Sequence, residues 1–301
     1  MPFLSAFAEN VLPILVIALL GYLFQRRLKP DVQPLSRVTL YVLTPSLIFS
    51  SLSNSTVSYD QMGRIGLCVV LVTASLALVN IVLVRVLRWD RRRQAAFMLT
   101  TLFGNVGNYG LPLTGFAFGV EGQALAVVYY VVSAVLVYSV GVYLASLGQQ
   151  TAREALGNVF RLPLVYAAGA ALVVNVAELH LPLPLTRAID LAGQGAVPLM
   201  ILLLGMQLAR TRVGGHAAPA LLASALKLIA SAALAFAWTT WLGLGGLAQG
   251  ICVVQAGMPS AVMTTLLALE FSTHPGLVTT TVLVSTLLSL VTLSVLLALV
   301  T

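Results

Sequence analysis

The sequence predicts an all-α integral membrane protein in which ten transmembrane helices form two inverted five-helix repeats. Three observations predict this fold class. Hydrophobic residues make up 59% of the 301 residues and charged residues 8%, with a mean hydropathy of +1.00, whereas soluble domains carry about 25% charged residues. The apolar residues gather in ten long stretches, and the basic residues gather in alternate connections between these stretches.

The ten apolar stretches have the length of membrane-spanning helices, which need roughly 20 apolar residues. They cover residues 7–24, 35–53, 63–87, 94–119, 122–147, 162–177, 186–209, 217–242, 246–270 and 275–300. Each is expected to be a helix because lipid offers no partner for the open edge of a strand. Arg26, Arg27 and Lys29 follow the first stretch, whereas a signal peptide carries its positive charge in front. The first stretch is therefore expected to be a retained transmembrane helix.

The basic residues predict the orientation of the chain. Thirteen of the 16 Lys and Arg residues lie in the first, third, fifth and seventh connections. Arg64 and Arg187 lie on the opposite side, and Lys227 lies within a span. Positive charge marks cytoplasmic loops, so both termini are expected on the outer, periplasmic side. The net charge of +7 is then explained by orientation in a lipid bilayer, and no nucleic-acid partner is expected.

The ten spans divide into two halves, residues 1–150 and 151–301. Because five is an odd number, the second half enters the membrane from the opposite side, which makes the repeat inverted. Pro45 in the second span and Pro198 in the seventh follow Arg37 and Arg187 by 8 and 11 residues. We predict helix breaks at both prolines.

The fourth and ninth spans are interrupted near the expected membrane midplane by glycine, proline and amide residues. The interruptions contain Gly104, Asn105, Gly107, Asn108, Tyr109, Gly110 and Pro112 in the fourth span, and Gln255, Gly257, Pro259 and Ser260 in the ninth. Proline removes a backbone donor and glycine loosens the backbone, so Gly104, Pro112, Gly257 and Pro259 are the expected hinges. Interrupted helices at matching positions of two halves indicate the substrate site of a transporter.

These motifs resemble the auxin efflux carrier family, specifically its short bacterial permeases. The resemblance rests on the ten-helix plan, on G-N-x-G-x-x-G-L-P at residues 104–112, on the helices of Pro45 and Pro198, and on Gly-Met-Pro at residues 257–259. It implies a fold shared with bile-acid-type and sodium/proton exchangers, in which spans four and nine cross as broken helices. Spans one, two, six and seven would form a scaffold that dimerises. Spans three to five and eight to ten would form a moving transport domain.

The resemblance further implies an elevator-type carrier of carboxylates in a bacterial inner membrane. Known cargoes of the family are indole-acetate in plants, and malate or malonate has been proposed for bacterial members. Two departures matter here. The loop at residues 148–160 is short, whereas the plant carriers have a long hydrophilic loop there. Ser133, near Tyr129, Tyr130 and Tyr138, replaces an expected asparagine on the fifth span, so the pocket differs in polarity.

Helix N-termini carry unpaired N–H groups and about half a positive charge. Two broken helices that cross would direct such ends at the midplane, which makes an anion site for a mono- or dicarboxylate. Asn105, Asn108, Gln255 and Ser260 are expected to add hydrogen bonds. Lys227 has two readings of equal weight: it attracts the substrate, or its amine reaches the cytoplasmic surface or an internal partner.

Three modes of coupling are compatible with the sequence. No cofactor or metal is expected, and the acidic residues lie near span ends or in loops, so a proton relay is not visible. Sodium held by unwound carbonyls, proton coupling and potential-driven exit of an anion all stay open.

Three rival functions have distinct signatures. An enzyme is not expected, because His180, His216 and His274 lie at loops or helix ends without a paired nucleophile. An anion channel would need a continuous polar pore, and its flux would neither saturate nor show counterflow. A non-transporting receptor would bind an anion without flux.

Cys68 and Cys252 lie within apolar stretches and are interpreted as packing residues.

Overall fold

The computed structural model describes residues 3–147, 151–211, 214 and 216–300. Within these ranges the chain is helical, and its one β-type contact is a single bridge between Gly104 and Ser260. The prediction of an all-helical membrane protein is thus confirmed at this level. Cys68 and Cys252 are both free and buried, as expected for packing residues.

The N-terminal half contains α-helices interrupted by π-helical turns, which are labelled η. Its elements are α1 (Phe3–Ala6), η1 (Phe7–Val11), α2 (Leu12–Leu28), α3 (Val32–Val38), η2 (Thr39–Leu43), α4 (Thr44–Ser53), α5 (Tyr59–Val86), α6 (Arg91–Leu102), η3 (Val106–Gly110), α7 (Leu111–Leu136), η4 (Val137–Gly141) and α8 (Val142–Ala145). Helix α7 is interrupted by a kink at Gly119, whose φ of 66° and ψ of −158° are non-helical, and this kink lies where the fourth predicted span ends.

The C-terminal half likewise consists of α-helices and includes the π-helical turn η5. Its elements are α9 (Ala152–Val159), α10 (Pro163–Val176), α11 (Leu183–Arg210), α12 (Ala217–Ala225), η5 (Leu226–Ala230), α13 (Ser231–Trp241), α14 (Gly246–Ala256), α15 (Val262–Glu270) and α16 (Pro275–Val300).

Seven of the described helical segments are long and apolar enough to cross a membrane. They are Phe3–Leu28, Val32–Ser53, Tyr59–Val86, Val106–Ala145, Leu183–Arg210, Ala217–Trp241 and Pro275–Val300. Two shorter apolar helices are α10 and α14. The number is lower than ten because α10 and α14 are shorter than a full span, with α14 ending at the break after Ala256. In addition, Val106–Ala145, of 40 residues, contains the non-helical Gly119 and covers parts of two predicted spans. The protein is therefore a multi-pass membrane protein, and the ten-span count stays a prediction.

The two prolines in the second and seventh predicted spans behave differently. Pro45 begins α4 directly after the π-helical turn η2. Pro198 lies inside α11, which continues to Arg210, so the predicted break at Pro198 is wrong. A proline inside a helix removes the hydrogen bond to the carbonyl four residues earlier, here that of Gln194, and its ring crowds that carbonyl; α11 nevertheless continues past both residues.

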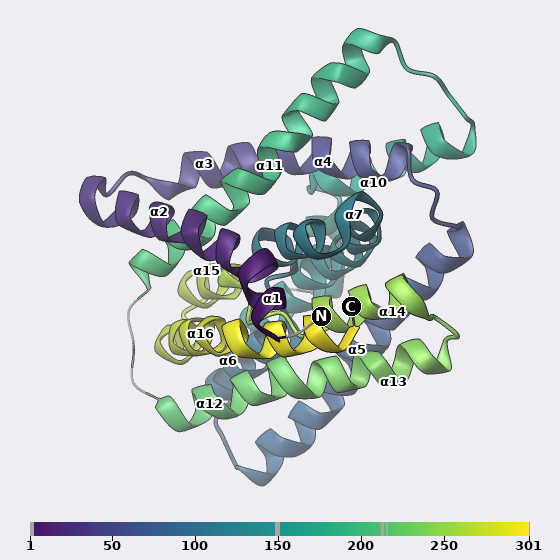
Figure 1. Ribbon diagram of the computed structural model, residues 1–301. Helices are drawn as coiled ribbons and strands as arrows, with labels where there is room; N and C mark the ends of the chain where they lie inside the picture. Colours follow the sequence, from purple (N-terminus) through teal and green to yellow (C-terminus); the bar gives the residue numbers. More distant parts are fainter. Residues whose placement is uncertain (1–2, 148–150, 212–213, 215, 301) are drawn as a thin grey trace.

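The helices pack in two groups with α7 between them (Figure 1). One group contains α2, α3, α4, α10 and α11, and the other contains α5, α6 and α12 to α16. Helices α2 and α11 touch through their backbones, because a Cβ on Gly21 would overlap the Leu202 carbonyl and one on Gly205 would overlap the Ala18 carbonyl. Small residues permit this close approach, which is the usual way helices associate in lipid.

Candidate functional site

The two interrupted segments meet at an isolated antiparallel bridge between Gly104 and Ser260. Helix α6 ends at Leu102 and α14 ends at Ala256. The Asn105 N–H donates to the Pro259 carbonyl at 2.7 Å, and the Ala261 N–H donates to the Phe103 carbonyl at 2.9 Å. We name this contact between residues 103–105 and 259–261 the crossover. It pairs backbone groups that would be costly to leave unpaired at membrane depth.

Neighbouring helices hold the crossover in place. The Ser260 hydroxyl donates to the Thr100 carbonyl at 2.7 Å, and the Ser260 N–H donates to the Ser285 hydroxyl at 3.1 Å. Every residue from 251 to 260 is buried. The crossover is thus anchored to α6 and α16, and its backbone is shielded from lipid.

Two helical segments have their N-termini at the crossover: η3 begins after Asn105, and α15 begins after Ala261. Neither cap residue makes a side-chain hydrogen bond to its helix. The first-turn N–H groups of both segments therefore lack the side-chain acceptor that caps usually supply. Their partial positive charges add at one place.

A cavity of about 170 Å³ lies against these two N-termini, and we name it the crossover cavity. Residues 104–108 and 261–263 form one wall, and Tyr130, Ser133 and Tyr138 form another. The remaining polar lining comes from the group of α2, α3, α4, α10 and α11, and consists of Ser36, Thr39, Thr44 and Gln207. Drug-sized ligands occupy roughly 300 Å³ or more, so this cavity suits a smaller molecule.

The structure divides the predicted binding residues into three sets. Gly104, Asn105, Gly107, Asn108 and Ser133 line the crossover cavity. The Asn105 side chain is 6% exposed, and its amide nitrogen has no hydrogen-bond partner.

The second set lies inside the crossover. Gly257, Pro259, Ser260, Tyr109, Gly110 and Pro112 are buried and outside the lining of the crossover cavity. A Cβ on Gly110 would overlap the Gln255 amide, so this glycine allows the broken helix α14 to approach η3. These residues therefore belong to the packed interior of the crossover and not to the wall of the cavity.

Gln255 and Lys227 form the third set, on the other side of Gly104. They line a separate cavity of about 20 Å³, which we name the Lys227 cavity. Lys227 is 3% exposed, and its Nζ donates to the Ala256 carbonyl at 2.6 Å. Its amine has an internal partner and does not reach a membrane surface.

Sequence reasoning did not identify the wall contributed by Ser36, Thr39, Thr44 and Gln207. One signal was present, since Gln207 is an uncharged amide within an apolar stretch and such groups face protein or water in lipid. The hydroxyls carried no signal, because Thr39 Oγ1 donates to the Leu35 carbonyl of its own helix, as many membrane hydroxyls do.

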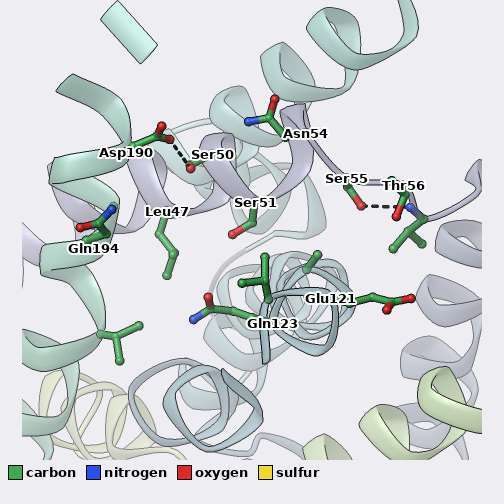
Figure 2. A pocket seen from close by; sticks show the side chains of 15 residues that line it. Leu47, Ser50, Ser51, Asn54, Ser55, Thr56, Glu121, Gln123, Asp190 and Gln194 are labelled. Atoms are coloured by element: carbon green, nitrogen blue, oxygen red, sulfur yellow. Dashed lines mark hydrogen bonds between the residues drawn. The ribbon is translucent and has the colours of Figure 1, made fainter. Parts of the chain in front are cut away.

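A third and larger cavity, of about 670 Å³, lies between α4, α11 and the middle of α7 (Figure 2). We name it the Asp190 cavity. Glu121, Gln123 and Gln194 are part of its lining, and the Ser50 hydroxyl donates to Asp190 at 2.5 Å. Along α4 and α11 it lies at the opposite end from the crossover cavity, which touches residues 36–44 and 203–207.

The crossed broken helices, the cavities at both ends of α4 and α11, and the several apolar helices define a multi-pass membrane transport protein. A family model described as "membrane transport protein" matches residues 6–156 and 152–297. The chain belongs to this family, the auxin efflux carrier family that its motifs resemble.

Two archaeal relatives match over nearly the whole chain. An uncharacterized transporter of Methanothermobacter thermautotrophicus is 29% identical over 296 residues, which cover 95% of each chain. An uncharacterized transporter of Methanocaldococcus jannaschii is 22% identical over 296 residues, which cover 95% of this chain and 96% of that protein. These similarities support transport as the general role, and they carry no information on the cargo.

Proposed function

We propose that the protein is a secondary carrier that moves small organic carboxylate anions across the cytoplasmic membrane by elevator-type alternating access. The observation that carries the proposal is the meeting of two uncapped helix N-termini at the crossover cavity. Helix N-termini bind anions through free N–H groups and the helix dipole. Asn105, whose side-chain nitrogen has no partner, adds a further donor.

The charge of the crossover cavity favours reversible binding. None of the described residues that line it is Asp, Glu, Lys or Arg. A carboxylate would therefore be held by N–H dipoles and by neutral side chains such as Asn105, Asn108 and Ser133. Neutral donors bind an anion without forming a buried ion pair, whose separation would be costly. The anion could then leave as readily as it enters.

Two cavities at opposite ends of one interface support the elevator motion. The crossover cavity and the Asp190 cavity both lie where α4 or η2 and α11 face α7 or η3. We propose that α2, α3, α4, α10 and α11 are the scaffold and that α5 to α8 and α12 to α16 move against it. The movement would carry the crossover from one cavity to the other.

We assign ten spans in two inverted repeats, with α6 to α7 as the fourth and α14 to α15 as the ninth. The positive connections place both termini outside. Arg37 and Arg210 then lie at the cytoplasmic end of the scaffold, so the crossover cavity faces inward and the Asp190 cavity faces outward. The scaffold would also form a homodimer, for which the exposed apolar side chains Leu12, Val16 and Leu19 of α2 offer a surface.

A ligand screen by thermal shift on purified protein tests the anion site. The probes are malonate, malate, acetate and indole-acetate, each compared with its neutral amide. A carboxylate at 100 times its dissociation constant would add about 2.7 kcal/mol to the free energy of unfolding. We expect at least one acid, and none of the amides, to raise the melting temperature. Equal responses to an acid and its amide would contradict an anion site.

Two alternatives remain distinguishable by flux. An anion channel would carry the identified anion without saturation, and a receptor would bind it without carrying it. The paired cavities at opposite ends of the interface favour a carrier over both.

A further inference from the structure

Lys227 places its amine on the end of a broken helix. Ala256 is the last residue of α14, and its carbonyl accepts from Lys227 Nζ at 2.6 Å. The Ser231 hydroxyl lies 2.6 Å from the same oxygen. A helix C-terminus carries about half a negative charge on its unpaired carbonyls. A protonated amine at this place neutralises a dipole end that the break in the ninth predicted span leaves in the protein interior.

The Lys227 amine is buried without a carboxylate. It is 3% exposed, and among the described residues the one ion pair joins Arg64 and Asp60, elsewhere in the fold. Burial of a charge is costly unless the charge is paired or hydrogen-bonded. Here the partners are the Ala256 carbonyl and, at 3.5 Å, the Ser231 hydroxyl. Uncharged oxygens are the ligands that proteins use for sodium in unwound membrane helices.

The amine also touches the crossover. A Cβ on Gly104 would lie 2.9 Å from Lys227 Cε and 3.1 Å from Nζ, so the lysine side chain lies directly against the crossover at Gly104. Gln255 lines the adjacent Lys227 cavity, and both atoms of its buried amide lack a partner. This cavity, about 20 Å³, has room for one water molecule. The amine thus lies between two oxygens that accept from it, those of Ala256 and Ser231, and a small cavity that Gln255 also lines.

We propose that Lys227 is a tethered cation, which occupies a binding place for a monovalent cation on the α14 C-terminus and makes bound sodium unnecessary for the crossover. Its oxygen partners, its burial and its contact with Gly104 are the expected features of such a place. The consequence for coupling rests on the proposed carrier: anion movement would need no sodium gradient. The site itself does not depend on that function.

The test measures thermal stability and therefore needs no cargo. Wild-type protein and Lys227→Ala are compared in chlorides of sodium, ethylammonium and N-methyl-D-glucamine at equal ionic strength. We expect the wild-type melting temperature to be the same in all three. Removal of the amine should lower the melting temperature by roughly 10 °C in N-methyl-D-glucamine, and sodium or ethylammonium should restore part of that loss.

Lys227→Met is the matched control, because its side chain fills the space without a charge. It should be destabilised and should show no recovery in either small cation. A wild-type protein that sodium stabilises would overturn the proposal, and this arm holds even if Lys227→Ala fails to fold. Equal melting temperatures of Lys227→Ala in all three salts would also overturn it. Neither result depends on whether a carboxylate binds.

Discussion

At the scale of single residues, two buried asparagines differ in how their side-chain amides are hydrogen-bonded. Asn80 donates to the Leu76 carbonyl at 2.7 Å and accepts from the Thr101 hydroxyl at 3.1 Å. The Asn105 amide nitrogen has no hydrogen-bond partner, although the residue is buried and only 6% exposed. A buried donor without an acceptor costs about 1–3 kcal/mol. Asn105 therefore carries a cost that a bound anion would offset.

Replacement of these two asparagines should have opposite effects. Asn105→Ala should leave the free energy of unfolding within about 1 kcal/mol of wild type, because no hydrogen bond is lost. It should also abolish the melting-temperature increase caused by the carboxylate. Asn80→Ala should lower the free energy of unfolding by about 1–3 kcal/mol and keep the response to the carboxylate. An Asn105→Ala protein with a full response would remove this residue from the site.

Substitution of Gly110 should lower the melting temperature through a steric clash at the crossover. In Gly110→Ala the new methyl group would overlap the Gln255 amide, and overpacking of this kind costs about 1–3 kcal/mol. Gly169 of α10 is the matched control, because a Cβ there meets no atom within 4 Å. Thermal melts should show a lower melting temperature for Gly110→Ala and an equal or higher one for Gly169→Ala. Similar melting temperatures for the two variants would refute the close approach of η3 and α14.

At the scale of elements, local sequence signals identified the interruptions but not their contacts. Glycine, proline and amides within residues 104–112 and 255–260 were sufficient to predict two breaks. The bond from Asn105 to Pro259 and that from Lys227 to Ala256 join distant positions in the sequence, and no local pattern encodes such pairs. Pro198 shows the opposite failure, because α11 continues through this local helix breaker.

Pro259 tests whether the break in the ninth predicted span is needed for movement. Pro259→Ala restores a backbone donor and permits helical backbone at the preceding residue, so the crossover should loosen. We expect loss of carboxylate flux with normal membrane insertion. Pro163→Ala is the control, because Pro163 stands in the first turn of α10, where proline is tolerated. Wild-type flux in Pro259→Ala would show that this proline is dispensable.

At the scale of the whole molecule, composition and charge predicted a membrane protein, and the family comparison confirms a transport protein. The positions of the cavities required the structure, since each combines residues from both halves of the chain. Ten spans and the outside location of the termini stay predictions. Helix α7 contacts both helix groups (Figure 1), so any sliding of one group past the other has to occur along its surface.

Counterflow in proteoliposomes tests the central claim, which is that the crossover holds an anion and exposes it to one side at a time. Vesicles that contain purified protein are loaded with an excess of the unlabelled carboxylate identified by thermal shift and are diluted into a trace of the labelled anion. We expect a transient accumulation of label above its outside concentration, and no such accumulation in vesicles that contain Asn105→Ala. Label that only equilibrates, with a rate proportional to concentration, would contradict alternating access and indicate a channel.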